Sequence, residues 1–152
     1  MAKNYSIPVL TASGTSAKSG ATLTAKADIR PIIYDVVIGN SESPNDYAWR
    51  AQLQRYASTN DGTGTSVTPA PLDPTDPPAL TITKNAHTAE PTSYVSGKVL
   101  LEFNANLRTQ TRWVAYYGSE LVSVMAANEG IGFRLDNATT ALILRGTILF
   151  RE

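Results

Sequence analysis

The feature that most constrains this chain is a series of short segments in which apolar and polar residues alternate. Segment 48–56, for example, places Trp49, Ala51 and Leu53 on one side and arginine and glutamine residues on the other. A repeat of two residues is the period of a half-buried β-strand, and no stretch carries the apolar stripe of an amphipathic helix. We therefore expect an all-β fold.

Eight segments carry this signal, separated by polar or proline- and glycine-rich turns. The 152 residues include 30 serines and threonines and 19 glycines and prolines, a composition that favours short strands and turns. Such strands and spacings are typical of an antiparallel β-sandwich or jelly roll of about eight strands. The expected strands are 29–39, 48–56, 80–83, 98–104, 111–117, 121–125, 131–135 and 141–150.

Two of these segments predict which side chains enter the core. Alternate residues of a strand point to opposite faces of the sheet, so the large apolar residues of one parity are expected to pack inward. The predicted core residues are Ile32, Tyr34, Val36 and Ile38 in the first strand and Val99, Leu101 and Phe103 in the fourth.

The last expected strand, 141–150, is apolar on both faces. One face carries large apolar residues between Leu142 and Phe150, and the other carries Ile143 and Leu149. In a two-sheet sandwich only one face of a sheet meets the core. The second face is expected to be covered by a neighbouring subunit, which predicts a homo-oligomer.

Two segments are expected to lie outside the regular sandwich. Residues 1–27 are predicted to form an N-terminal arm or first strand plus a flexible loop, and 28–152 to form the β-sandwich domain. Segment 57–78 holds five of the nine prolines, so it cannot be an interior strand. It is predicted to be an extended arm on a neighbouring chain, anchored by Val67 and Leu72; the alternative is a disordered surface loop.

Loop-closure entropy changes slowly with loop length. From the sequence alone, we therefore expect that shortening segment 57–78 would leave the sandwich nearly as stable.

The composition excludes several kinds of active site. The chain has no cysteine, which removes disulfides, thiolate zinc sites and cysteine nucleophiles, and its only histidine is His87, which we expect to be an exposed loop residue. No Gly-x-Ser-x-Gly motif supports a catalytic triad, and Gly130-x-Gly132 lacks the third glycine of a phosphate-binding loop. We expect no enzymatic activity, no cofactor and no metal.

Two chemical alternatives stay open because suitable side chains are present. One is a pair of carboxylates for glycoside hydrolysis, and the other is a calcium site. The residues concerned are Glu102, Glu120 and Glu129 for the first and Asp61, Asp73 and Asp76 for the second.

The charge balance argues against some partners. Thirteen basic and thirteen acidic residues give a net charge of zero, so the chain has no overall attraction to nucleic acid or to an anionic membrane. No apolar run is long enough for a membrane helix, and Pro8 interrupts any signal-peptide core. We expect a protein made in a cytoplasm.

The densest cationic and aromatic cluster has three possible roles. It is a stacking platform for a sugar or a single-stranded nucleic acid, a protein interface, or an ordinary strand with Trp113 and Tyr117 in the core. Zero net charge argues against the nucleic acid. The cluster comprises Arg108, Arg112, Trp113, Tyr116 and Tyr117.

Segments 62–79, 107–117 and 144–152, together with the order of strands, resemble small virion structural proteins of tailed bacteriophages and prophages. These are β-sandwich or jelly-roll proteins that serve as capsid decoration (cement) or head-associated proteins, and the similarity covers most of 28–152. The resemblance implies a homo-oligomer, with a trimer preferred, that binds the major capsid protein or other virion proteins. It implies a place in the virion, assembled in the host bacterial cytoplasm, and no catalytic residues.

The leading hypothesis is therefore a phage capsid decoration protein that stabilises the head through protein–protein contacts. The alternative is a carbohydrate-binding jelly-roll module or a receptor-binding virion component that uses Trp113 or Tyr116. The predicted interface residues are Val67, Leu72, Arg112, Trp113, Tyr116, Ile143 and Leu149.

Overall fold

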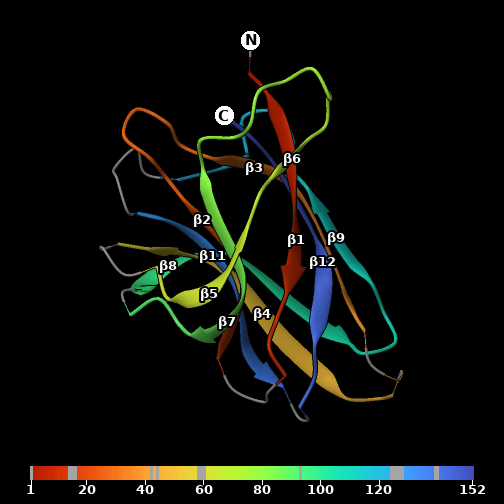
Figure 1. The fold of residues 1–152 in the computed structure, drawn as a ribbon. Helices are drawn as coiled ribbons and strands as arrows, with labels where there is room; N and C mark the ends of the chain where they lie inside the picture. The colour runs from red at the N-terminus through yellow and green to blue at the C-terminus, as the bar shows by residue number, and fades with distance from the viewer. Residues whose placement is uncertain are drawn as a thin grey trace.

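A computed structural model describes residues 2–13, 17–41, 43, 45–57, 61–92, 94–123, 129–138 and 141–152. The regular secondary structure of these residues consists of β-strands only. Twelve strands form two antiparallel sheets that pack face to face (Figure 1). The predicted all-β sandwich is confirmed, and the jelly-roll topology stays a prediction. No helix among these residues is long and apolar enough to cross a lipid bilayer.

The first sheet has the order β10-β3-β12-β1-β6, and β9 also pairs with β3. The second sheet has the order β5-β7-β2-β11-β4-β8. The strands are β1 (Asn4–Leu10), β2 (Lys18–Thr24), β3 (Ile32–Asn40), β4 (Ala48–Tyr56), β5 (Thr63–Val67), β6 (Ala70–Pro71), β7 (Ile82–Ala89), β8 (Tyr94–Asn106), β9 (Thr111–Val114), β10 (Leu121–Val122), β11 (Gly130–Ala138) and β12 (Leu144–Arg151).

One hydrophobic core fills the space between the sheets, and β12 contributes heavily to it. Leu142, Leu144, Ile148 and Phe150 are completely buried, as the alternation predicts. Phe150 lies beside Tyr5 of β1, and their rings stack with centroids 5.5 Å apart. The strand begins later than expected because its regular pairing starts at Leu144.

A β-bulge in β3 makes part of the core prediction wrong. The register between β12 and β3 shifts so that Leu149 pairs with Asp35 and Phe150 with Ile33, which leaves Tyr34 without a paired residue. One extra residue in a strand reverses the faces of all residues before it. Ile33 is therefore fully buried instead of Ile32 and Tyr34, whereas Val36 and Ile38 are buried as predicted.

A second bulge corrects the prediction for β8. Leu53 of β4 pairs with Leu101, but the next residue of β4 pairs with Val99, so β8 holds one extra residue at Leu100. Val99 is consequently 41% exposed, while Phe103 is buried as predicted.

We expected a flexible loop in residues 12–27, and this expectation was wrong. The segment contains β2, an interior strand between β7 and β11. Ser19 to Thr24 are all buried. The sequence does not reveal this strand because its residues are small and show no alternation of large apolar and polar side chains. The packing requires a small residue at Gly20, where a Cβ would lie 2.9 Å from side-chain atoms of Val9 and Thr11. Of the two alternatives for the N-terminal residues, an arm or a first strand, the structure has the strand, β1.

Segment 57–78 is also partly regular. β5 pairs with β7 at the edge of the second sheet, and β6 pairs with β1 at the edge of the first. The chain between them therefore crosses from one sheet to the other and closes that side of the sandwich (Figure 1). The prolines keep it out of interior positions as predicted, but it pairs with its own chain; residues 58–60 lie outside the described residues.

Candidate functional site

The outer face of the first sheet is the surface that best fits a binding role. β9 pairs with β3 so that Trp113 lies beside the buried Val36, and Arg112 and Val114 point away from the core. Val114 is 53% exposed. We define the β3 outer face as Ile32, Asp35, Val37, Arg112, Val114 and Leu149.

An ion pair neutralises the charge at the centre of the β3 outer face. Asp35 accepts two hydrogen bonds from Arg112, at 3.1 Å from Nε and 2.6 Å from Nη2. The hydrogen bond and the charge of Asp35 raise the pKa of Arg112 above its usual value. Asp35 is only 4% exposed, although it lies on the outer face. The guanidinium thus covers the carboxylate. The apolar side chains of Ile32, Val37, Val114 and Leu149 share this face with the exposed Arg112 and Thr147.

Two tyrosines project beside this face, in the turn that follows β9. Tyr116 is 87% exposed and Tyr117 is 98% exposed. The backbone N–H and the hydroxyl of Ser119 both donate to the Tyr116 carbonyl, at 2.9 and 2.8 Å, and Gly118 adopts a φ of 84°. These bonds order the backbone of the turn, which presents both tyrosine side chains to solvent, and tyrosine is a residue type that interfaces favour.

The structure brings together some of the predicted interface residues and separates others. Arg112 and Leu149 share the β3 outer face, and Tyr116 lies in the adjoining turn. Trp113 packs against the core instead. Val67 lies in β5, at the edge of the second sheet, and Leu72 follows β6, at the edge of the first sheet away from β3. Ile143 precedes β12, and its carbonyl accepts a hydrogen bond from the Ser41 N–H.

Sequence reasoning missed Val114 and misplaced Tyr117. Strict alternation from an inward Trp113 would have directed Val114 outward. Tyr117 was a candidate for the core because the strand was expected to continue to residue 117, but β9 ends at Val114.

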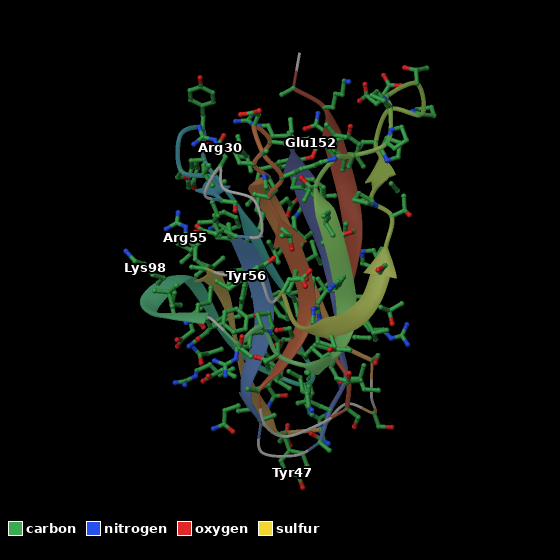
Figure 2. All side chains as sticks on the ribbon, turned by 60° about the vertical axis from the view of Figure 1, so that its left-hand side comes forward. Arg30, Tyr47, Arg55, Tyr56, Lys98 and Glu152 are labelled. Carbon is green, nitrogen blue, oxygen red and sulfur yellow. The ribbon has the colours of Figure 1, made fainter. Side chains whose placement is uncertain are left out.

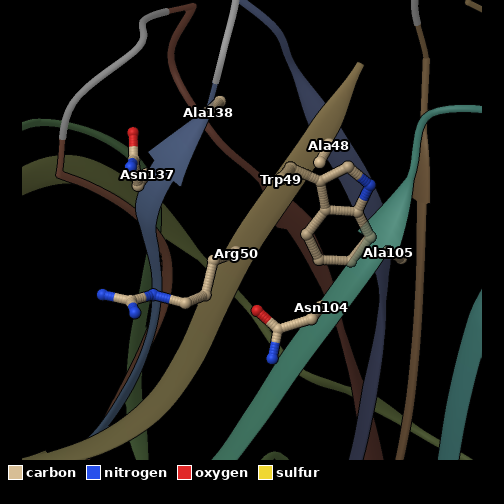
Figure 3. Close-up of a pocket in the computed structure, with 7 residues that line it drawn as sticks. All are labelled: Ala48, Trp49, Arg50, Asn104, Ala105, Asn137 and Ala138. Atoms are coloured by element: carbon tan, nitrogen blue, oxygen red, sulfur yellow. The ribbon is translucent and has the colours of Figure 1, made fainter. Parts of the chain in front are cut away.

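A separate hollow of about 450 Å³ lies on the second sheet (Figure 3). Arg50 of β4 lies between Asn137 of β11 and Asn104 of β8, and it forms an ion pair with Asp136. Tyr47, 49% exposed, precedes the hollow along the chain at the end of the molecule opposite Glu152 (Figure 2). The lining residues are Ala48, Trp49, Arg50, Asn104, Ala105, Asn137 and Ala138.

Gly130 and Gly132, which do not match a phosphate-binding loop, have a structural role instead: each makes room for a tyrosine side chain. The Tyr56 side chain crosses Gly130, its paired residue on β11, and reaches Thr24 Oγ1 on β2 at 2.6 Å. Tyr94 packs over Gly132 in the same way and lies 2.6 Å from Ser19 Oγ. Burial raises the pKa of both tyrosines, so both hydroxyls stay protonated.

The carboxylates considered for calcium or for glycoside hydrolysis make local bonds. Asp61 pairs with Lys84 at 2.7 Å, and Asp73 accepts from the Thr75 N–H and hydroxyl, which lowers the pKa of Asp73. Glu102 accepts from Gln52 and Asn104. Across the described ranges, no three acidic or histidine side chains gather as a metal site would need.

His87 is not an exposed loop residue, and that expectation was wrong. It lies in β7 and is completely buried. The polar neighbours that suggested a loop, such as Asn85 and Lys84, belong to the same strand.

No protein-family model, curated protein or solved structure compared with this chain matches it.

Proposed function

We propose that this chain is a structural protein that acts by binding other protein chains, and that it is a capsid decoration or head-associated protein of a phage virion. In this proposal it is not an enzyme. It forms a homo-oligomer, preferably a trimer, in the host bacterial cytoplasm and attaches to the major capsid protein. The phage assignment rests on the sequence resemblance of 62–79, 107–117 and 144–152.

The group of apolar side chains on the β3 outer face is the observation that carries the binding role. In a two-layer sandwich the outer side of each sheet meets solvent and is normally polar. Here Val114 is half exposed, and Ile32, Val37 and Leu149 are only partly buried around it. The exposed Tyr116 and Tyr117 extend this surface with residue types that interfaces favour. A protein partner is the simplest cover for such a surface.

Replacing Val114 with aspartate tests this role. Wild-type protein at micromolar concentration is expected to show a mass well above 16.3 kDa by sedimentation or light scattering. V114D places an unpaired carboxylate in the proposed contact, so we expect at least a tenfold weaker association.

Val99→Asp is the matched control, because Val99 is similarly exposed but lies on the second sheet. It should leave the association unchanged. A monomeric wild-type protein, or equal losses in both variants, would show that the β3 outer face is not the interface.

The virion assignment has a test of its own. Mass spectrometry of purified particles from a strain that carries this gene should find the chain in many copies per particle. Its absence from the particles would remove the virion role and leave the oligomer intact.

The hollow beside Arg50 favours a second candidate function, the binding of a carbohydrate. Its polar lining consists of a guanidinium and two amide side chains, Asn104 and Asn137, which suit hydrogen bonds to sugar hydroxyls. Arg50 is held in place by Asp136. Trp113, one of the two rings that the sequence suggested for stacking, packs against the core, and the indole of Trp49 in the hollow is only 2% exposed. Neither indole offers an open stacking face.

A glycan array tests whether the hollow binds a carbohydrate. If the hollow binds sugars, Asn137→Ala is expected to reduce binding at least tenfold, whereas Tyr116→Ala should change it less than twofold. Binding that depends on Tyr116 alone would move the sugar site to the turn after β9.

A further inference from the structure

His87 is enclosed between the second sheet and the segment that forms the sheet's edge. Its Nε2 lies 3.3 Å from Thr22 Oγ1 of β2 and 3.2 Å from the Asp61 carbonyl oxygen. Nδ1 is buried and has no hydrogen-bond partner among the described residues. Gly64 of β5 covers the ring so closely that a Cβ there would lie 3.0 Å from Nδ1. Gly64 therefore covers one face of the ring, and solvent does not reach Nδ1 in the closed structure.

The strand β7 is distorted where it holds this residue. Thr63 pairs with Ala89 and Thr65 with Asn85, so a step of two positions along β5 corresponds to a step of four along β7. Ala86, within this bulge, has a φ of 47°, a conformation that non-glycine residues rarely adopt. The bulge sets His87 beneath β5.

The covering segment, Asp61–Val67, is held mainly by polar contacts. Lys84 Nζ binds the Asp61 carboxylate at 2.7 Å and the Gly62 carbonyl at 3.2 Å, and Thr83 Oγ1 donates to the Val67 carbonyl at 2.6 Å. Thr63, Thr65 and Ser66 are exposed. An edge strand with so little buried apolar surface opens locally more readily than the core strands.

The charges around His87 do not prepare it for a proton. Burial lowers the pKa of His87 most, and Lys84 on the same strand acts in the same direction. The Asp61 carbonyl, Glu90 and the Ser19 backbone act against this without reversing it. The carboxylates of Asp61 and Glu90 are already paired, with Lys84 and with Arg134 of β11, and the nearby Tyr56 and Tyr94 are neutral.

We infer that His87 is an acid-sensitive latch: protonation of its enclosed imidazole releases β5 and the Asp61–Gly62 turn from β7. A charged ring cannot be solvated beneath Gly64, and it can be once the segment lifts away. Release leaves the outer edge of β7 with unpaired backbone groups.

The direction of the pH effect follows from proton linkage. A free histidine titrates near pH 6.5, and the enclosed one has a lower pKa, so the open form binds the proton more tightly between these two values. The closed form therefore has its full stability above about pH 6.5 and loses it as the pH falls toward the lowered pKa. If His87 stays neutral in the closed form at pH 5.0, the opening equilibrium rises about 30-fold between pH 7.5 and 5.0.

Amide hydrogen exchange of the full chain at pH 7.5 and 5.0, corrected for intrinsic exchange, tests the latch. We expect the opening equilibrium of Thr63–Val67 to increase by about 30-fold, and to lie well above that of β12 at both pH values because the segment opens locally. Because His87 is the only histidine, its ring signals in NMR report its pKa without overlap. A ring that titrates near 6.5, or β5 amides that exchange as slowly as those of β12 at both pH values, would overturn the inference.

Two variants separate the latch from a general effect on stability. His87→Gln keeps a planar polar group without a titrating proton, so the exchange of β5 should become independent of pH. Lys84→Met removes the ion pair with Asp61, so β5 should open more at both pH values while keeping the rise between them. If H87Q does not fold, the wild-type and K84M measurements still decide: loss of the pH effect in K84M would assign it to the ion pair.

Discussion

Gly130→Ala is expected to lower the free energy of unfolding by about 3 kcal/mol. A Cβ at this position would overlap the Leu23 carbonyl oxygen and the Tyr56 side chain. The carbonyl belongs to the neighbouring strand β2 and cannot move without breaking the sheet. Displacing the Tyr56 ring would also strand its buried hydroxyl away from Thr24.

Chemical denaturation of G130A and wild-type protein measures this loss. Gly39→Ala is the matched control, because Gly39 is also in a strand and its nearest neighbour to a new Cβ is a Gln110 side-chain carbon at 3.8 Å. It should change the stability by less than about 0.5 kcal/mol. Similar stabilities for G130A and G39A would contradict the packing of the Tyr56 side chain directly over Gly130.

Replacing residues 62–71 with a glycine–serine linker of equal length is expected to cost about 3 kcal/mol. From closure entropy alone, we expected changes in this region to be nearly neutral. The structure changes that expectation, because β5 and β6 pair with the edges of both sheets and the Thr83 hydroxyl binds the Val67 carbonyl. Each lost hydrogen bond is worth about 1 kcal/mol, and His87 would lose its cover.

The same replacement at residues 73–75 is the control. That turn is exposed, and the bonds of Asp73 to Thr75 are local. Its replacement should cost less than about 1 kcal/mol in the same denaturation experiment. If both linkers have equally small effects, segment 62–71 is the independent arm that the prolines suggested.

The candidate interface was predictable only in part. Alternation within β12 correctly separated Leu149 from the core residues on either side, and the cationic and aromatic composition of 108–117 pointed to Arg112 and Tyr116. The ion pair of Arg112 with Asp35 joins residues 77 positions apart, so it depends on the pairing of β9 with β3. No local pattern reports such a pairing.

The sequence by itself determined the fold class and the eight strands whose large side chains alternate, because that alternation is a local property of a half-buried strand. It also determined that the proline-rich segment does not form an interior strand, since proline lacks the donor that such a strand needs. Only the tertiary structure decided the place of β2, the bulges in β3, β7 and β8, and the burial of His87. Each of these depends on what a neighbouring strand presses against the chain: Val9 and Thr11 on Gly20, Gly64 on His87. Such contacts form only when separate strands pack together, and small or polar side chains give no sign of them in the sequence.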